Sequence, residues 1–163
     1  MKTRTATIKR KTTETDISVT VNLDGTGKYK VETGIGFLNH MLELFSKHSL
    51  IDLTVNAKGD LKVDKHHTVE DVGIFLGEAL RKAIGDKKGI ERYGFLLPMD
   101  EALAEVAIDL GGRSYLVWNV TFKREKTGDM PTELFEDFFK AIADNLQANI
   151  HIKSYQRKES GSS

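Results

Sequence analysis

The stretch Asp64-Lys65-His66-His67-Thr68-Val69-Glu70-Asp71 places two imidazoles beside carboxylates, directly before a run of residues with helical periodicity. At about 100° per residue, His66, His67 and Glu70 fall within roughly a 100° arc of one helical face. An apolar stripe borders this arc, made of Val69, Val72, Leu76, Ala79, Leu80 and Ala83. Imidazole and carboxylate are ligands of Mn²⁺, Fe²⁺ and Zn²⁺ sites. The stretch therefore predicts either a metal site at the edge of a buried surface or a polar first turn with two exposed histidines.

The composition narrows the class of protein and the kind of site. A chain of 163 residues fits a single domain. Its 24 basic and 24 acidic residues balance, so no strong field favours nucleic acid or an anionic membrane. The absence of cysteine excludes disulfides and thiolate sites and leaves nitrogen and oxygen ligands. With neither a leader-like N-terminus nor an apolar run of about 18 residues, we expect a soluble, cytoplasmic protein without nucleic-acid or membrane partners.

Apolar periodicity predicts the same order of elements twice. In the first half we expect strands over 3–11 and 17–23, a helix over 35–47, a strand over 51–57 and a helix over 66–83. In the second half we expect strands over 104–110 and 116–122, a helix over 132–146, and a strand that has Ile150 and Ile152 on one face and His151 on the other. The predicted fold class is α+β, a duplicated strands–helix–strand–helix unit with helices on one face of a sheet.

The second repeat lacks the helix that would correspond to 66–83. We expect one domain over 1–155, with a first repeat over about 1–88, an incomplete second repeat over about 89–155, and a disordered polar tail over 156–163. Half of one sheet face would then lack its helix, which predicts an exposed apolar patch or a covering chain.

Further motifs occur in order along the chain. They are TET at 13–15, TGIGFLNHML at 33–42, HHTVED at 66–71, ERYG at 91–94, PMDEAL at 98–103 and DLGGR at 109–113. Together, in order and approximate spacing from about Arg4 to Lys153, they resemble the imidazoleglycerol-phosphate dehydratase family. Several ordered motifs are far more specific than one HHxxE pattern. The chain is identified as a member of this family.

The resemblance implies a hydro-lyase of histidine biosynthesis, which dehydrates imidazole glycerol phosphate to imidazole acetol phosphate. It implies a duplicated ribosomal protein S5 domain 2-like fold, two Mn²⁺ ions per complete active site, and a 24-subunit homo-oligomer that shares sites between subunits. By position, the matched metal ligands are His40, His66, His67, Glu70 and His151. The matched substrate contacts are Glu14, Arg92 and Arg113, and the matched catalytic residues are Glu14, Glu70 and Asp100.

These residue types suit the reaction. Loss of water requires removal of a weakly acidic proton next to the imidazole, which metal binding to the ring favours and a carboxylate such as Glu14 can assist. Arginine forks suit a phosphate. Taken singly, each residue also has a plainer interpretation. His40 would be a core histidine, His151 and Glu14 would face solvent, and the arginines would pair with Asp100 or Asp109.

The chain departs from the family after His151. Family members continue through a glycine-asparagine turn into a second HHxxE helix and a serine-lysine phosphate motif. This chain instead reads QRKESGSS from 156 to 163. Three expected metal ligands and two phosphate contacts are thereby missing. The alternative hypothesis is therefore a truncated, catalytically inactive member with at most a partial metal site.

Overall fold

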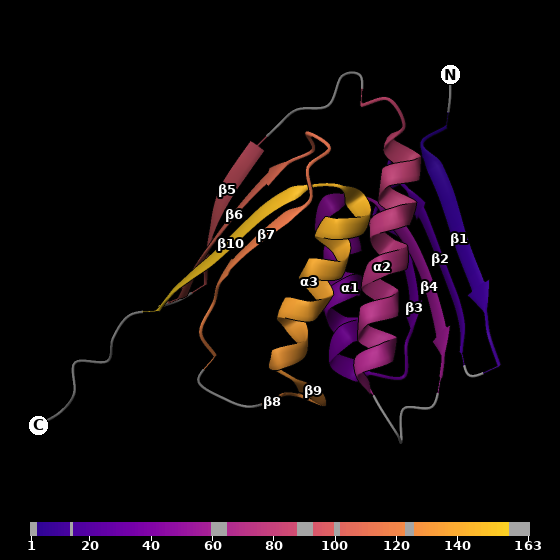
Figure 1. The fold of residues 1–163 in the computed structure, drawn as a ribbon, viewed down its shortest axis with the longest axis horizontal. Helices are drawn as coiled ribbons and strands as arrows, with labels where there is room; N and C mark the ends of the chain where they lie inside the picture. The colour runs from indigo at the N-terminus through magenta and orange to yellow at the C-terminus, as the bar shows by residue number, and fades with distance from the viewer. Residues whose placement is uncertain are drawn as a thin grey trace, which may run out of the picture.

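The computed structural model describes residues 3–13, 15–59, 65–87, 93–99, 102–122 and 126–156. The first half contains β1 (Thr5–Lys11), β2 (Asp16–Asn22), β3 (Tyr29–Glu32), α1 (Gly36–Ser49), β4 (Asp52–Lys58) and α2 (Lys65–Ile84). The second half contains β5 (Tyr93–Met99), β6 (Ala102–Asp109), β7 (Tyr115–Asn119), β8 (Lys126–Thr127), β9 (Met130–Pro131), α3 (Glu133–Leu146) and β10 (Asn149–Gln156). The three helices lie between two four-stranded sheets (Figure 1).

The two sheets repeat one topology. The first sheet has the order β1-β2-β4-β3 and the second has the order β5-β6-β10-β7. In each, two antiparallel pairs are followed by one parallel pair, β3 with β4 and β7 with β10. A helix makes each parallel crossover, as parallel pairing requires. The duplicated α+β fold is therefore confirmed, with each sheet carrying helices on one face.

The first sheet buries its inner face completely. Alternate residues of β2 point toward the helices, so Ile17, Val19 and Val21 are 2%, 0% and 0% exposed. The whole apolar stripe expected on α2 is buried against this sheet and against α3. This half contains most of the continuous core.

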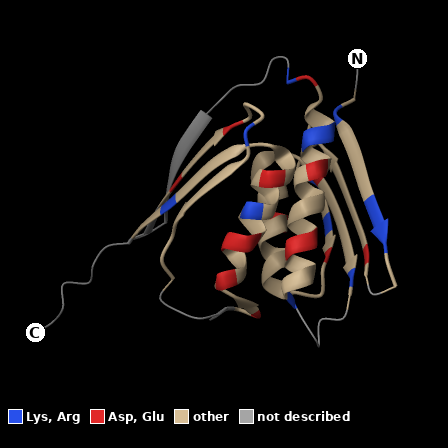
Figure 2. Cartoon of the chain, viewed as in Figure 1, with Lys and Arg blue, Asp and Glu red and all other residues tan. Residues whose placement is uncertain are grey.

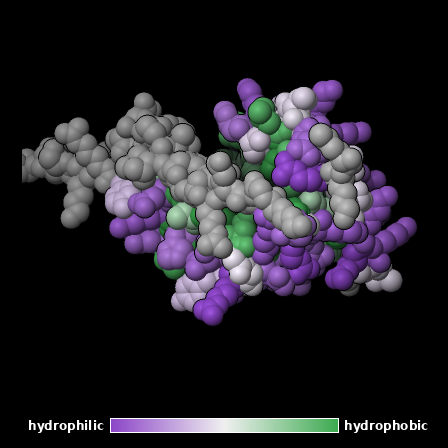
Figure 3. Space-filling model, turned by 90° about the horizontal axis from the view of Figure 1, so that it is seen from above, coloured by the Kyte–Doolittle hydropathy of each residue, from purple (hydrophilic) through white to green (hydrophobic). Residues whose placement is uncertain are grey.

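The second sheet is less completely covered on its inner face. Ile150 is buried, whereas Val106, Ile108 and Ile152 on the same face are half-buried. Within the described part of the chain, α3 is the helix that packs on this sheet, and it does so along β7. In the view of Figure 3, hydrophobic residues reach the surface near the middle of the visible face, between regions where hydrophilic residues prevail. These observations agree with the expected gap in the helical cover.

Helices α2 and α3 join the two halves at a close crossing. A Cβ placed on Gly73 would lie 2.8 Å from the carbonyl oxygen of Phe138, and one on Gly77 would lie 2.8 Å from that of Ile142. Glycine is therefore required at both positions, because the atom in the way belongs to the facing backbone. No helix in the described ranges is long and apolar enough to cross a membrane.

Four strands are not predicted by the sequence patterns, and two predicted strands end at other residues than expected. β3 buries only Val31, which is too little for a periodic signal, and β8 and β9 have two residues each. β5 lies at a sheet edge, where its proline is tolerated. β7 ends at Asn119 rather than at 122, and beyond its end the Phe122 ring packs on Phe135 with 5.1 Å between centroids. β10 includes Gln156, which the sequence assigns to the tail, and 157–163 lie outside the described residues.

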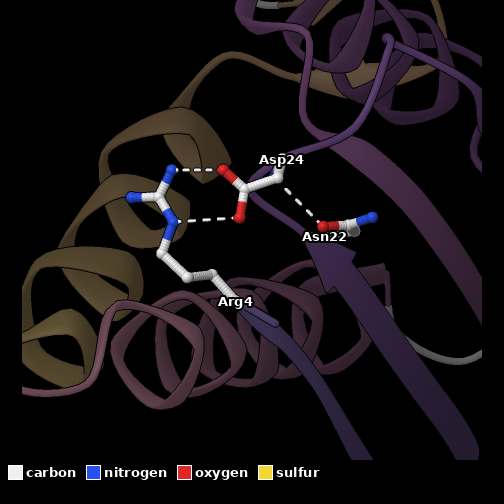
Figure 4. Close-up of polar contacts among 3 residues, drawn as sticks. All are labelled: Arg4, Asn22 and Asp24. Atoms are coloured by element: carbon white, nitrogen blue, oxygen red, sulfur yellow. Dashed lines mark hydrogen bonds and ion pairs between the residues drawn. The ribbon is translucent and has the colours of Figure 1, made fainter. Parts of the chain in front are cut away.

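A bidentate ion pair between Arg4 and Asp24 connects the segment before β1 to the turn after β2 (Figure 4). Arg4 donates from Nε and Nη2 to the two carboxylate oxygens of Asp24, at 3.1 and 2.6 Å. The backbone N–H of Asp24 donates to the side-chain oxygen of Asn22 at 3.0 Å. The side-chain hydrogen bond from Arg4 holds the pKa of Asp24 below its usual range.

Candidate functional site

The histidine-rich stretch forms the first turns of α2. His66 and Glu70 are neighbours one turn apart, with 3.6 Å between Nε2 and Oε2. The His67 ring lies 6.1 Å from the His66 ring, and His67 is exposed. All three side chains reach solvent at the edge of the buried stripe, as the helical spacing predicts.

An additional carboxylate reaches this turn from α3. Asp137 Oδ2 lies 3.2 Å from His66 Nε2, closer than the Glu70 oxygen. The two helices form a cavity of about 350 Å³ here, with Asp137 and Asp144 on one wall and His66 and Glu70 on the other. Figure 2 shows acidic residues at several points along both helices, on the side turned to the viewer. The sequence does not predict the place of Asp137, because an acidic residue near the start of a helix is the only signal that Asp137 leaves.

Asp71 is not among the residues that line this cavity, and its charge interacts with that of Arg10 on β1. Burial raises the pKa of Asp71, and the negative charge of Glu70 raises it further, while His67 and Arg10 act in the opposite direction. The Arg10 guanidinium lies over the Phe75 ring at 5.4 Å. Asp71, Arg10 and Phe75 thus connect the histidine turn to the first sheet, and none of the three is a further histidine for the candidate site.

His40 lies on the exposed side of α1. Its ring is 6.2 Å from that of Phe37. The loop before α1 is fixed by Asn39, whose side-chain oxygen accepts hydrogen bonds from the backbone N–H and the hydroxyl of buried Thr33, at 2.9 and 2.5 Å. The interpretation of His40 as a core histidine is therefore wrong, because its side chain is exposed.

A distant carboxylate caps the helix that carries His40. The Asp129 carboxylate accepts hydrogen bonds from the backbone N–H groups of Gly36 and Phe37, at 2.6 and 2.9 Å. It replaces the side-chain cap that apolar Ile35, at the N-cap position of α1, does not provide. The hydrogen bond from Phe37 is the main reason that the pKa of Asp129 lies below its ordinary value. Lys65, at the start of α2, donates to the backbone oxygen of Asp129 at 2.8 Å. The β8–β9 turn thus fixes the starts of α1 and α2 together.

His151 lies on the outer face of the second sheet. Ile150 and Ile152 on either side of it face the helices, so the expected orientation of His151 is confirmed. His151 lines a cavity of about 370 Å³, together with residues that include Glu105, Ala107, Val117, Asn119, Lys153 and Tyr155. The Tyr155 hydroxyl donates to Glu105 at 3.0 Å, and the Lys153 ammonium lies 4.8 Å from the Tyr155 ring. Arg113 is exposed in the loop between β6 and β7.

The expected ligands therefore occupy three separate places in one chain. His66, His67 and Glu70 are together on α2, His40 lies on α1, and His151 lies on the far side of the second sheet. The residue types fit Mn²⁺, which accepts nitrogen and oxygen donors. Among the residues that the structure describes, no three His, Asp or Glu side chains are grouped to hold an ion. Glu14, Arg92 and Asp100 lie outside the described residues.

Comparison with known proteins assigns the chain to the family that its motifs resemble. The family model for imidazoleglycerol-phosphate dehydratase matches residues 33–161. The histidine biosynthesis bifunctional protein HisB of Spirosoma linguale is 57% identical over 150 residues, which are 92% of this chain and 39% of that protein. The imidazoleglycerol-phosphate dehydratase of Acetivibrio thermocellus is 57% identical over 148 residues, which are 90% of this chain and 76% of that one. The chain thus spans less than half of the bifunctional relative and about three quarters of the other.

A solved structure shares the fold. The crystal structure of imidazoleglycerol-phosphate dehydratase from Staphylococcus aureus aligns with a TM-score of 0.83 and 38% identity, over 96% of this chain and 86% of that chain. The aligned portion therefore includes both sheets and all three helices.

Proposed function

The chain belongs to the imidazoleglycerol-phosphate dehydratase family, and from this premise we propose that it catalyses the dehydration of imidazole glycerol phosphate to imidazole acetol phosphate. The observation that carries the proposal is the first turn of α2, where His66, His67 and Glu70 present metal-type donors side by side. We propose a cytoplasmic enzyme of histidine biosynthesis that acts on this small phosphorylated imidazole.

We propose that Mn²⁺ is the cofactor, with two ions per complete site. His66, His67 and Glu70 would provide donors from α2, and His40 and His151 would provide donors from the other two places. The donor types support this assignment. When bound, Mn²⁺ supplies Lewis acidity at the substrate ring.

The three separate places support shared sites in a homo-oligomer. His151 lies outside the second sheet, while His66 lies in the cavity between α2 and α3. A sheet separates them, so one ion can take donors from both only if the donors come from different copies. The 24-subunit form implied by the resemblance is one closed arrangement with this property.

The other matched residues have separate tasks in the proposal. Arg113 and Arg92 hold the phosphate through paired N–H donors. Glu14 and Asp100 hold or move the protons that the elimination requires, at the carbon beside the imidazole and at the departing hydroxyl. Of these four residues, Arg113 is in the described part of the chain, exposed and able to meet an anionic substrate.

An assay of dehydration with and without added Mn²⁺, combined with native mass determination, tests the function. We expect turnover that depends on Mn²⁺ and a mass of many chains. His151→Ala should reduce kcat/KM by at least about 100-fold, since it removes a metal donor. His48→Ala is the matched control, because His48 is an exposed histidine of α1 that matches no family ligand. A single-chain mass without turnover would refute the proposal.

A further inference from the structure

The turn between β8 and β9 is anchored in the core and lies directly against the start of α1. Gly128 and Asp129 form a two-residue hairpin loop, and Gly128 has a φ of +60°, which glycine adopts without strain. The next residue, Met130, is 0% exposed. A Cβ placed on Gly128 would lie 3.3 Å from the Cβ of Phe37, in the first turn of α1. The turn is therefore a fixed point beside this helix start.

Asp129 connects the turn to both helices that carry candidate donors. Its carboxylate accepts two backbone N–H groups at the start of α1, at 2.6 and 2.9 Å. Its backbone oxygen accepts a hydrogen bond from the Lys65 ammonium at the start of α2, at 2.8 Å. His40 lies one helical turn after the start of α1, and His66 directly follows Lys65. Three hydrogen bonds thus connect the two donor-bearing turns to one residue.

We propose that Asp129 is a positioning residue for the proposed metal site. Its side chain sets where α1 presents His40, and its backbone oxygen, through Lys65, sets where α2 presents His66. The proposal rests on the proposed function, in which both histidines are metal ligands. Removal of a group that orients a metal ligand typically costs about 10–100-fold in metal affinity. A frayed first turn of α1 would leave His40 with a range of positions and so weaken binding.

Two other roles of Asp129 make different predictions. A cap that only stabilises α1 would change the free energy of unfolding and leave the Mn²⁺ affinity of the folded protein unchanged. A carboxylate that only attracts the cation would act through its charge, so its replacement by an amide would be as harmful as its replacement by alanine. A positioning role requires the hydrogen-bond acceptor rather than the charge.

Three variants separate these roles. Asp129→Ala removes the acceptor and the charge. Asp129→Asn removes the charge and keeps a side-chain oxygen, and amide and carboxylate oxygens cap helices about equally well. Asp52→Ala is the matched control, because Asp52 Oδ1 also accepts two backbone N–H groups, those of Thr26 and Lys28, at 2.9 and 2.8 Å. That turn packs through Gly27 against the last turn of α1, at the opposite end of the same helix.

A second pair of variants tests the backbone oxygen. Lys65→Met keeps the length of the side chain and removes the donor to Asp129. Lys82→Met is its control, because Lys82 is an exposed lysine in the last turn of the same helix. Each of the two variants removes one positive charge from α2.

Two measurements are made on the full chain. A titration of Mn²⁺ followed by its electron paramagnetic resonance signal reports affinity, and NMR of metal-free protein reports the ring signals of His40 and His66. We expect Asp129→Ala to shift the His40 signals and to weaken Mn²⁺ binding about 10-fold. Asp129→Asn and Asp52→Ala should stay close to the wild type in affinity. Lys65→Met should shift the His66 signals and weaken binding, whereas Lys82→Met should do neither.

Equal Mn²⁺ affinity of Asp129→Ala and Asp52→Ala, or binding by Asp129→Asn that is as weak as by Asp129→Ala, would overturn the proposal. Unshifted His66 signals in Lys65→Met would overturn the part assigned to the backbone oxygen. If the wild type neither binds Mn²⁺ nor dehydrates the substrate, the proposed function fails. The His40 signals of metal-free Asp129→Ala then still support or refute the role of Asp129 in placing that histidine.

Discussion

The two sheets share their strand order and pairing, yet their inner faces differ in burial. Val19 on β2 is fully buried, whereas Val106 on the corresponding strand β6 is half-buried. Two helices, α1 and α2, pack on the first sheet, and α3 packs on the second within the described ranges. Strand pairing thus sets the architecture of each half, while the helical layer determines how much apolar surface leaves water.

Matched valine substitutions sharpen this comparison and should give the largest effect. Val19→Ala removes buried methyl groups and leaves a cavity, so we expect a loss of about 2–3 kcal/mol in the free energy of unfolding. Val106→Ala removes groups that already contact solvent and should cost less than about 1 kcal/mol. Urea unfolding of both variants measures the difference, and equal losses would show that the two faces are equally buried.

A substitution at the helix crossing disrupts the junction of the two halves. Gly77→Ala places a methyl group against the backbone oxygen of Ile142. Overpacking of this kind costs about 1–3 kcal/mol, against a gain of about 1 kcal/mol in helix propensity. We expect net destabilisation by thermal unfolding. Arg81→Ala, at an exposed position of the same helix, should stay within about 0.5 kcal/mol of the wild type, and a more stable Gly77→Ala would contradict the close crossing.

Removal of the cap on α1 shows whether the second half stabilises the first. Asp129→Ala leaves the N–H groups of Gly36 and Phe37 without their acceptor, which should cost about 0.5–2 kcal/mol at neutral pH. Hydrogen exchange of these two amides should accelerate, while exchange in β2 should change little. Unchanged exchange at Gly36 and Phe37 would show that the cap is dispensable.

The same cap predicts a pH dependence with a definite sign. The pKa of Asp129 in the folded protein lies below its ordinary value of 3.8. Its contribution is therefore fully present above that value and is lost as pH falls through the folded-state pKa. The unfolding free energies of wild type and Asp129→Ala should differ at neutral pH and converge in acid. A constant gap across this range would contradict the role of the charged carboxylate.

Removal of the ion pair between Arg4 and Asp24 should have the smallest effect on stability. The pair belongs to the well-packed first half, but both of its side chains are exposed to solvent. Asp24→Asn should lower stability slightly, and the loss should disappear at high salt, because salt screens exposed charges. Thermal unfolding at low and high ionic strength measures this. A loss that persists at high salt would assign the effect to the turn and not to the charges.

The sequence predicts the parts of the fold that have a long apolar period. The stripe of α2 from Val69 to Ala83 and the alternation from Ile17 to Val21 both appear as expected, because each repeats a buried position several times. β3 could not be predicted in the same way, since a single buried residue, Val31, has no period.

The site is predictable only in part, for a related reason. His66, His67 and Glu70 are close in sequence, and helical geometry brings them together. Asp137 and Asp129 reach their partners across 71 and 93 residues, and a single acidic residue at such a separation leaves no local pattern. The separation of His40 and His151 from the histidine turn likewise depends on the packing of whole elements.

The cap on α1 also has a consequence for the order of folding during synthesis. Gly36 and Phe37 leave the ribosome long before Asp129 does, since 93 residues separate Gly36 from Asp129. The first sheet and most of α1 can form in that interval from residues already made, but the first turn of α1 gains its acceptor only after the β8–β9 turn has been translated and has docked. Arrested chains that end before residue 129 should therefore carry a frayed start of α1, next to a sheet that is already paired.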